Sequence, residues 1–223
     1  MKRLFLRSLC GLGLLAALSG HAQSVATPKV QITTNLGVIE AELYADKTPN
    51  TVANFLQYVK DKHYDGTVFH RVIASFMVQG GGFDRTYKQK PTRAPIQHEG
   101  RAATAAGLKN TTGTLAMART NDPHSATSQF FINVVDNAFL DPTPIPEGDP
   151  VKRFEYQGRV YENIPRSQLL NAPQLYGYTV FGKVTSGMDV VQKIRQTPTG
   201  SGGPFPTDVP QTPVVIQSIT LLP

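Results

Sequence analysis

The first candidate for chemistry is an arginine set among apolar side chains. Arg71 lies in the segment 68–73, whose alternation indicates a β-strand with Phe69, Arg71 and Ile73 on one face. A guanidinium stays charged and cannot act as a base, so beside apolar surface it serves as a fixed hydrogen-bond donor. Taken alone, an arginine on a strand is more often a surface residue than a catalytic group. We expect His70 on the opposite face, in a structural role.

A second segment, 129–134, has the same mixed character. Alternation puts Gln129, Phe131 and Asn133 on one face and three apolar side chains on the other. The apolar face belongs in a core, and a ring between two amides is typical of a binding groove. The alternative is a half-exposed strand that carries an aromatic ring by chance, and this segment alone does not decide between them.

The elements that must position these residues are short strands and two helices. Thr48 is an expected N-cap, because Pro49 can occupy the first helical position after it. The glycines at 80–82 are expected to end a strand, and 84–113 reads as a long functional loop. The expected strands are 30–34, 38–44, 68–73, 76–79, 115–118, 129–134, 178–184 and 214–222. One helix is expected at 49–61, and a second is indicated by the apolar stripe of Met188, Val191 and Ile194. This pattern favours an antiparallel barrel.

The stretch 141–176 differs in composition from the rest of the chain. It is rich in proline, carries charges of both signs and lacks a strong apolar period. We interpret it as an inserted loop within one domain that spans 28–223. A short hairpin is expected near 154–161.

The first 22 residues have the layout of a secretory signal peptide. A basic head is followed by an apolar run at 9–18 and by small residues before an expected cut after Ala22. The apolar run is half the roughly 20 residues that a membrane-spanning helix needs, which disfavours a permanent anchor. Cleavage removes the only cysteine, Cys10, and predicts export to the bacterial periplasm, with no membrane association afterwards.

Charge and motif content exclude several classes of function. The leader holds Lys2, Arg3, Arg7 and no acid, so cleavage lowers the formal net charge from +6 to +3, which disfavours a nucleic-acid partner. The histidines show no metal-ligand spacing, no helix start follows the glycines at 80–82, and no serine-hydrolase elbow is present. The sequence therefore predicts neither a metal nor a cofactor.

Four blocks of sequence occur together in the order typical of one known family. They are FHRVIASFMVQGGGF at 69–83, LAMAR at 115–119, SQFFIN at 128–133 and VFGKV at 180–184. Through them the chain resembles the cyclophilins over about residues 30–222, with 141–176 as the outlier. The resemblance implies a mainly β fold, a closed eight-stranded antiparallel barrel capped by two α-helices. It also implies peptidyl-prolyl cis/trans isomerase activity that assists the folding of exported proteins.

The resemblance assigns roles to the matching positions. Arg71 is the implied catalytic arginine, and Gln79, also implied as catalytic, is expected with Gln129 to hold the arginine and the substrate backbone. Ala118 is expected to form the floor of the neighbouring subsite, and the backbone of Arg119 to pair with an extended peptide. The implied substrate-binding residues, with the proline pocket first, are Phe76, Met77, Phe131, Leu140, Ala118, Arg119, Gln129, Phe139 and Tyr178.

Three positions depart from the family pattern. Ala74-Ser75 stands where the family usually has Pro-Gly, and Tyr178 replaces a common histidine. Phe139 stands where many eukaryotic members carry tryptophan, which removes an indole N–H donor, so weak cyclosporin binding is expected. Exported bacterial cyclophilins share the changes at 139 and 178, so neither argues against activity.

The expected partners are proline-containing polypeptides in unfolded or extended form, and the protein is expected to be a monomer. A proline-binding chaperone or scaffold with little catalysis is the main alternative, because the insertion can cover the groove or dock a partner. Arg71, Gln79 and Gln129 favour the enzyme, since peptide capture alone does not require the arginine.

Overall fold

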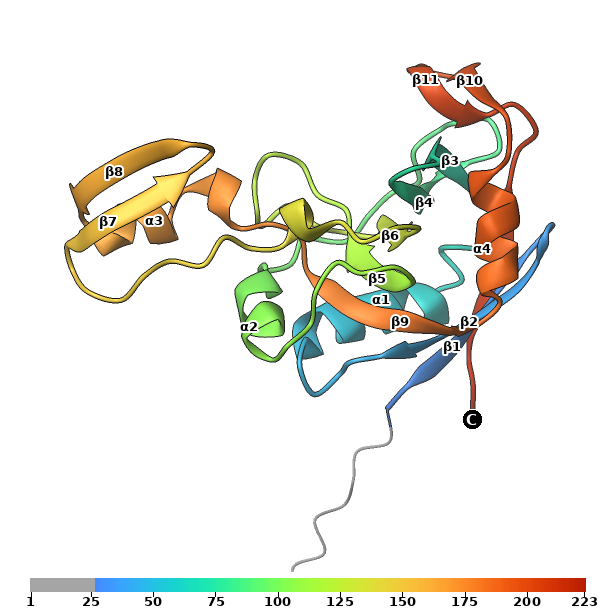
Figure 1. The fold of residues 1–223 in the computed structure, drawn as a ribbon. Helices are drawn as coiled ribbons and strands as arrows, with labels where there is room; N and C mark the ends of the chain where they lie inside the picture. Colours follow the sequence, from blue (N-terminus) through green and yellow to red (C-terminus); the bar gives the residue numbers. More distant parts are fainter. Residues whose placement is uncertain (1–26) are drawn as a thin grey trace, which may run out of the picture.

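The computed structural model describes residues 27–223, and the expected signal peptide lies outside the described residues. Eight antiparallel strands close into a barrel in the order β1-β12-β3-β4-β6-β5-β9-β2 (Figure 1). The barrel strands are β1 Lys29–Thr34, β2 Gly37–Leu43, β3 Thr67–Ile73, β4 Met77–Asp84, β5 Thr114–Met117, β6 Phe130–Asn133, β9 Val180–Ser186 and β12 Val215–Leu221. The predicted fold class is confirmed, and each of the eight segments expected to be strands overlaps one of these strands.

Alternation along the strands builds the barrel core. In β1 the buried residues include Val30 and Ile32, and in β2 they include Ile39 and Leu43, with more exposed residues between them. This spacing turns every second side chain inward. The apolar faces of two helices, α1 Pro49–Lys60 and α4 Met188–Arg195, pack into the same core, as expected.

The start of α1 is capped by a distant residue. Thr48 occupies the N-cap position before Pro49, as expected, but its side chain donates to the carbonyl of Tyr44 and makes no capping bond. The Glu99 carboxylate accepts instead from the backbone N–H groups of Asn50 and Thr51. A carboxylate at a helix N-terminus satisfies orphan donors and interacts favourably with the helix dipole, so it ties the 84–113 segment to the barrel.

The glycines at 80–82 do not end a strand, contrary to expectation. They lie within β4, where side chains from neighbouring elements leave no room for a Cβ atom. A Cβ on Gly81 would lie 2.8 Å from the Tyr64 ring, and one on Gly82 would lie 2.4 Å from the side chain of Gln129. Glycine therefore lets β4 pass close to Gln129 while the strand continues.

Several short elements were not expected from the sequence. A helix, α2 Gly100–Ala105, interrupts the predicted long loop at 84–113. A hairpin of β10 Thr199–Gly202 and β11 Phe205–Pro210 follows α4 and lies beside β3 (Figure 1). Among the described residues no helix is both long enough and apolar enough to span a membrane.

The 141–176 segment is a small structured unit that projects from the barrel (Figure 1). It contains the predicted hairpin, formed by β7 Val151–Tyr156 and β8 Arg159–Ile164. Two short helices follow, α3 Arg166–Leu170 and the 3-10 turn η2 Pro173–Leu175; a similar turn, η1 Ala138–Leu140, precedes the unit. The unit buries an apolar cluster of its own, made of Val151, Phe154, Leu169 and Leu175.

Candidate active site

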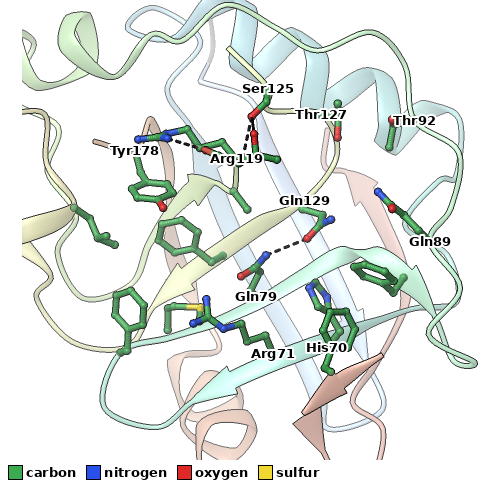
Figure 2. Close-up of a pocket in the computed structure, with 18 residues that line it drawn as sticks. His70, Arg71, Gln79, Gln89, Thr92, Arg119, Ser125, Thr127, Gln129 and Tyr178 are labelled. Carbon is green, nitrogen blue, oxygen red and sulfur yellow. Dashed lines mark hydrogen bonds between the residues drawn. The ribbon is translucent and has the colours of Figure 1, made fainter. Parts of the chain in front are cut away.

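Strand register brings the predicted catalytic residues together on the outer face of the barrel. Arg71 on β3 is the register partner of Gln79 on β4, which in turn is the partner of Phe131 on β6. The three side chains line one cavity of about 560 Å³ (Figure 2). The segments around 71 and 131, separate in the sequence, therefore form one surface.

The strict alternation expected for β3 was wrong. The register of β3 against β4 shifts around Phe69 and Arg71, so the two residues do not share a face. Phe69 packs in the barrel core, whereas both His70 and Arg71 line the cavity. Extra residues at such an irregularity re-aim side chains, and this puts a predicted structural histidine at the site.

The apolar half of the cavity contains the predicted proline pocket. Met77 and Phe131 are almost fully buried, and the Phe131 ring meets the Tyr178 ring edge-on at a centroid distance of 5.6 Å. Apolar walls of this kind exclude water from a bound ring. All the residues that line this half were expected from the sequence, namely Phe76, Met77, Ala118, Phe131, Leu140 and Tyr178.

Phe139 lies at the edge of the site and does not line the cavity. Its side chain is 74% exposed, and its ring stacks on that of Phe76 at a centroid distance of 5.5 Å. It therefore shields the outer side of one pocket wall.

The two glutamines bind each other and leave the arginine to a different partner. Gln79 Nε2 donates to Gln129 Oε1 at 3.0 Å (Figure 2). No hydrogen bond from either glutamine to Arg71 occurs within residues 27–223, so the expectation that they hold the arginine is not met. The charged partner of Arg71 is Asp208 on β11, with Nε and Oδ2 3.8 Å apart.

The segment around Arg119 is fixed by its side chain. The guanidinium donates to the carbonyl of Gly177 at 2.9 Å and lies 4.7 Å from the centre of the Tyr178 ring. Within the described part of the chain, neither the backbone N–H nor the carbonyl of Arg119 makes a hydrogen bond. This leaves both groups available to an extended peptide, which is the role that the resemblance implies for them.

A buried network of amides supports the pocket and was missed by the sequence reasoning. Asn133, expected in the groove, is fully buried and donates to the side chains of Asn110 and Thr114. Asn137 Nδ2 donates to the carbonyl of Phe76 at 2.9 Å and to Asn133 Oδ1 at 2.7 Å. Through these bonds the network holds the loops that carry two walls of the proline pocket.

The far half of the cavity was also not expected. Its wall includes the rings of His70, Phe83 and Phe205, which lie 4.6 to 5.4 Å apart between centroids. Burial lowers the pKa of His70 to about 4, so this ring is neutral at pH 7. Phe205 comes from the unexpected β10–β11 hairpin and had no periodic signal in the sequence.

Comparison with known proteins identifies the family. The model of the family described as cyclophilin type peptidyl-prolyl cis-trans isomerase matches residues 29–221. The chain belongs to this family. Catalysis of prolyl cis/trans isomerisation is the activity that the match and the bacterial relatives support.

Similar proteins carry the same description over nearly their whole lengths. A peptidyl-prolyl cis-trans isomerase of Acinetobacter baylyi is 46% identical over 93% of this chain and 92% of its own. Isomerase B of Escherichia coli is 45% identical over 86% of this chain and 98% of its own. A crystal structure of a Cryptosporidium parvum cyclophilin has the same fold, with a TM-score of 0.61 at 21% identity over 88% of this chain and 98% of its own.

Proposed function

We propose that Arg71 accelerates prolyl isomerisation by donating a hydrogen bond to the prolyl nitrogen in the twisted transition state. A planar peptide bond resists rotation with a barrier of about 18–20 kcal/mol, because its C–N bond has partial double-bond character. Twisting removes that character and localises a lone pair on the nitrogen. A donor aimed at this lone pair stabilises the twisted state more than the planar one, which is what catalysis requires.

The observation that carries this proposal is the common cavity of Arg71 and the proline pocket. Arg71 shares it with Met77 and Phe131, and the cavity of about 560 Å³ has ample room for a five-membered ring. The guanidinium offers N–H donors and no acceptor. A proline ring held against Phe131 would therefore lie in the same cavity as the arginine's donors.

The arginine alone does not account for the expected rate. Uncatalysed exchange takes about 10–100 s, so reaching milliseconds needs roughly 10⁴–10⁵-fold, or about 5–7 kcal/mol. A charged hydrogen bond contributes about 1.5–3 kcal/mol. The remainder is assigned to the apolar pocket, which strips water from the amide and holds the ring while the preceding carbonyl turns.

The substrates that fit this site are proline-containing polypeptides in extended form. The free backbone groups of Arg119 suit an extended chain, and the pocket around Phe131 suits the proline ring. A cyclophilin of Cryptosporidium parvum was crystallised in the presence of the dipeptide Ala-Pro, which supports the same class of substrate here. The proposed clients are unfolded exported proteins, and the protein is proposed to act as a monomer.

The experiment that tests the mechanism is NMR exchange spectroscopy on a short X-Pro peptide. Arg71→Ala should remove most of the catalysed exchange while circular dichroism and thermal unfolding stay those of the folded protein. Arg153→Ala on β7 is the matched control, since within residues 27–223 this arginine forms an ion pair only with exposed Glu155. If Arg71→Ala exchanges the peptide as fast as Arg153→Ala, the arginine has no part in the mechanism.

The proposed location is the bacterial periplasm, on the strength of the basic, apolar and small-residue order of the first 22 residues. Expression of the full chain in a bacterium, followed by fractionation and mass spectrometry, tests this. A periplasmic product that begins at Gln23 supports the proposal, and an uncut product in the cytoplasm refutes it.

A further inference from the structure

The β10–β11 hairpin brings a carboxylate to the catalytic arginine. Asp208 on β11 places Oδ2 3.8 Å from Nε of Arg71 on β3. Figure 1 shows the hairpin next to β3, and Phe205 of the same strand lines the cavity. The hairpin therefore touches the active site through two side chains, of which only Phe205 faces the space for substrate.

The backbone of the hairpin is shaped to aim Asp208 at the arginine. The pairing of β10 with β11 is irregular between Gly200 and Gly202, and Asp208 lies next to this irregularity. Asp208 has a φ of +67°, in the left-handed region, whereas its neighbour Val209 is buried. Bulges and left-handed residues near active sites commonly redirect a side chain, and such conformations persist where the surroundings hold them.

The contact leaves the catalytic end of the arginine unoccupied. Nε is the guanidinium nitrogen nearest the backbone, and the two terminal nitrogens lie beyond it. Within residues 27–223 the Arg71 side chain makes no hydrogen bond, and it is 45% exposed, so Asp208 is the charged group that restrains it. The attraction of the carboxylate favours side-chain positions that keep Nε beside Asp208, while the terminal N–H groups remain available to substrate.

We propose that Asp208 is a positioning residue that holds Arg71 in the orientation needed to meet the prolyl nitrogen. This inference rests on the proposed role of Arg71. Asp208 does not touch the substrate; it restricts the arginine to the productive arrangement before rotation begins. The consequence is a lower barrier at the same substrate affinity.

The expected effect is modest, because the pair is partly exposed. Exposed ion pairs contribute little free energy, so loss of the carboxylate should lower kcat by about two- to fivefold. The upper figure corresponds to ~1 kcal/mol at 1.36 kcal/mol per factor of ten. KM should stay unchanged, since the planar substrate does not need the oriented donor. Raising the salt concentration should narrow the gap between wild type and variant by screening the pair.

Asp208→Asn is the sharpest perturbation available. Asparagine tolerates the left-handed backbone as aspartate does, so the substitution removes the charge without new strain at φ +67°. Asp189→Asn on α4 is the matched control: it removes a carboxylate from an exposed pair with Lys193 and does not line the cavity. The control should leave kcat and KM as they are in wild type.

A double-mutant cycle separates positioning from a structural role. Exchange rates are measured by NMR for wild type, Asp208→Asn, Arg71→Ala and the double variant, with enough enzyme to follow the residual activity. If Asp208 acts through Arg71, Asp208→Asn has no effect in the Arg71→Ala background. A loss that persists in that background assigns Asp208 to the stability of the hairpin and overturns the inference.

The remaining outcomes distinguish this inference from the mechanism beneath it. An Asp208→Asn variant with the kcat of wild type, beside a nearly inactive Arg71→Ala, refutes the positioning role alone. A fully active Arg71→Ala refutes the proposed mechanism, and the positioning role with it.

Discussion

The amide network behind the proline pocket makes a strong prediction about Asn137. Its side chain is buried, and Nδ2 donates both to Phe76 O and to Asn133 Oδ1. Asn137→Ala leaves Asn133 Oδ1 buried without a donor, at about 1–3 kcal/mol, and removes a second bond worth about 0.5–1.5 kcal/mol. The Phe76 carbonyl still accepts a hydrogen bond from the N–H of Val134, so losing the bond from Asn137 to Phe76 costs less than losing the bond to Asn133. We expect a total of about 3 kcal/mol.

Thermal unfolding followed by circular dichroism measures this loss. For a chain of about 200 residues, 1 kcal/mol shifts Tm by about 2–4 °C, so Asn137→Ala should lower Tm by about 6–12 °C. The catalytic efficiency toward an X-Pro peptide should fall as well, because the loops that carry Phe76 and Leu140 lose their common anchor. Asn171→Ala, at the exposed C-terminal end of α3, is the control and should stay within about 0.5 kcal/mol of wild type. A Tm for Asn137→Ala that matches this control would refute the supporting role of the network.

Two further predictions concern an inhibitor and pH. Phe139→Trp should strengthen the proposed weak inhibition by cyclosporin. The substitution adds an N–H donor at a 74% exposed position next to Phe76. An inhibition titration that is the same for the variant and wild type would contradict this. Burial lowers the pKa of His70 and of His98 to about 4, against 6.5 in an unfolded chain, so the unfolded state takes up protons first as the pH falls. The free energy of unfolding should therefore decrease as the pH falls from about 6.5 to about 4. His70→Phe should flatten the dependence of Tm on pH over this range. If Tm changes with pH as steeply in the variant as in wild type, His70 is not the buried neutral ring inferred here.

The barrel could be predicted from the sequence because it depends on local patterns, whereas most residues of the proline pocket were implied by the resemblance to the cyclophilins. Alternation in segments such as 30–34 and 38–44 predicts strands with one buried face, and the same rule placed Phe131 on the outer face of β6. The helical stripe ending in Ile194 is likewise a local signal. Such patterns predict structure reliably because burying the apolar face of a strand is favourable wherever that strand lies in the fold.

The parts that could not be predicted depend on contacts between distant segments. The glycines at 80–82 read as a strand breaker, but the approach of Gln129 makes glycine a packing requirement. The capping of α1 by Glu99 joins residues far apart in the chain. The irregular register of β3 turns His70 toward the cavity, and no single-strand rule contains that information.

The hairpin that carries Asp208 illustrates the same limit at the active site. Its sequence is dominated by Gly, Pro, Ser and Thr and has no alternation, so it reads as a loop. Only the packing of β11 beside β3 shows that its single carboxylate lies against Arg71.

The central claim is that Arg71 acts on the twisted amide and contributes little to binding of the planar one. NMR line-shape analysis of one X-Pro peptide, titrated with wild type and with Arg71→Ala, measures the Kd and the exchange rate on the enzyme in the same experiment. We predict that the variant exchanges the bound peptide about 10- to 150-fold more slowly, as expected for the loss of 1.5–3 kcal/mol, with a Kd within about threefold of wild type. An unchanged exchange rate on the enzyme, with the whole loss in Kd, would contradict the account.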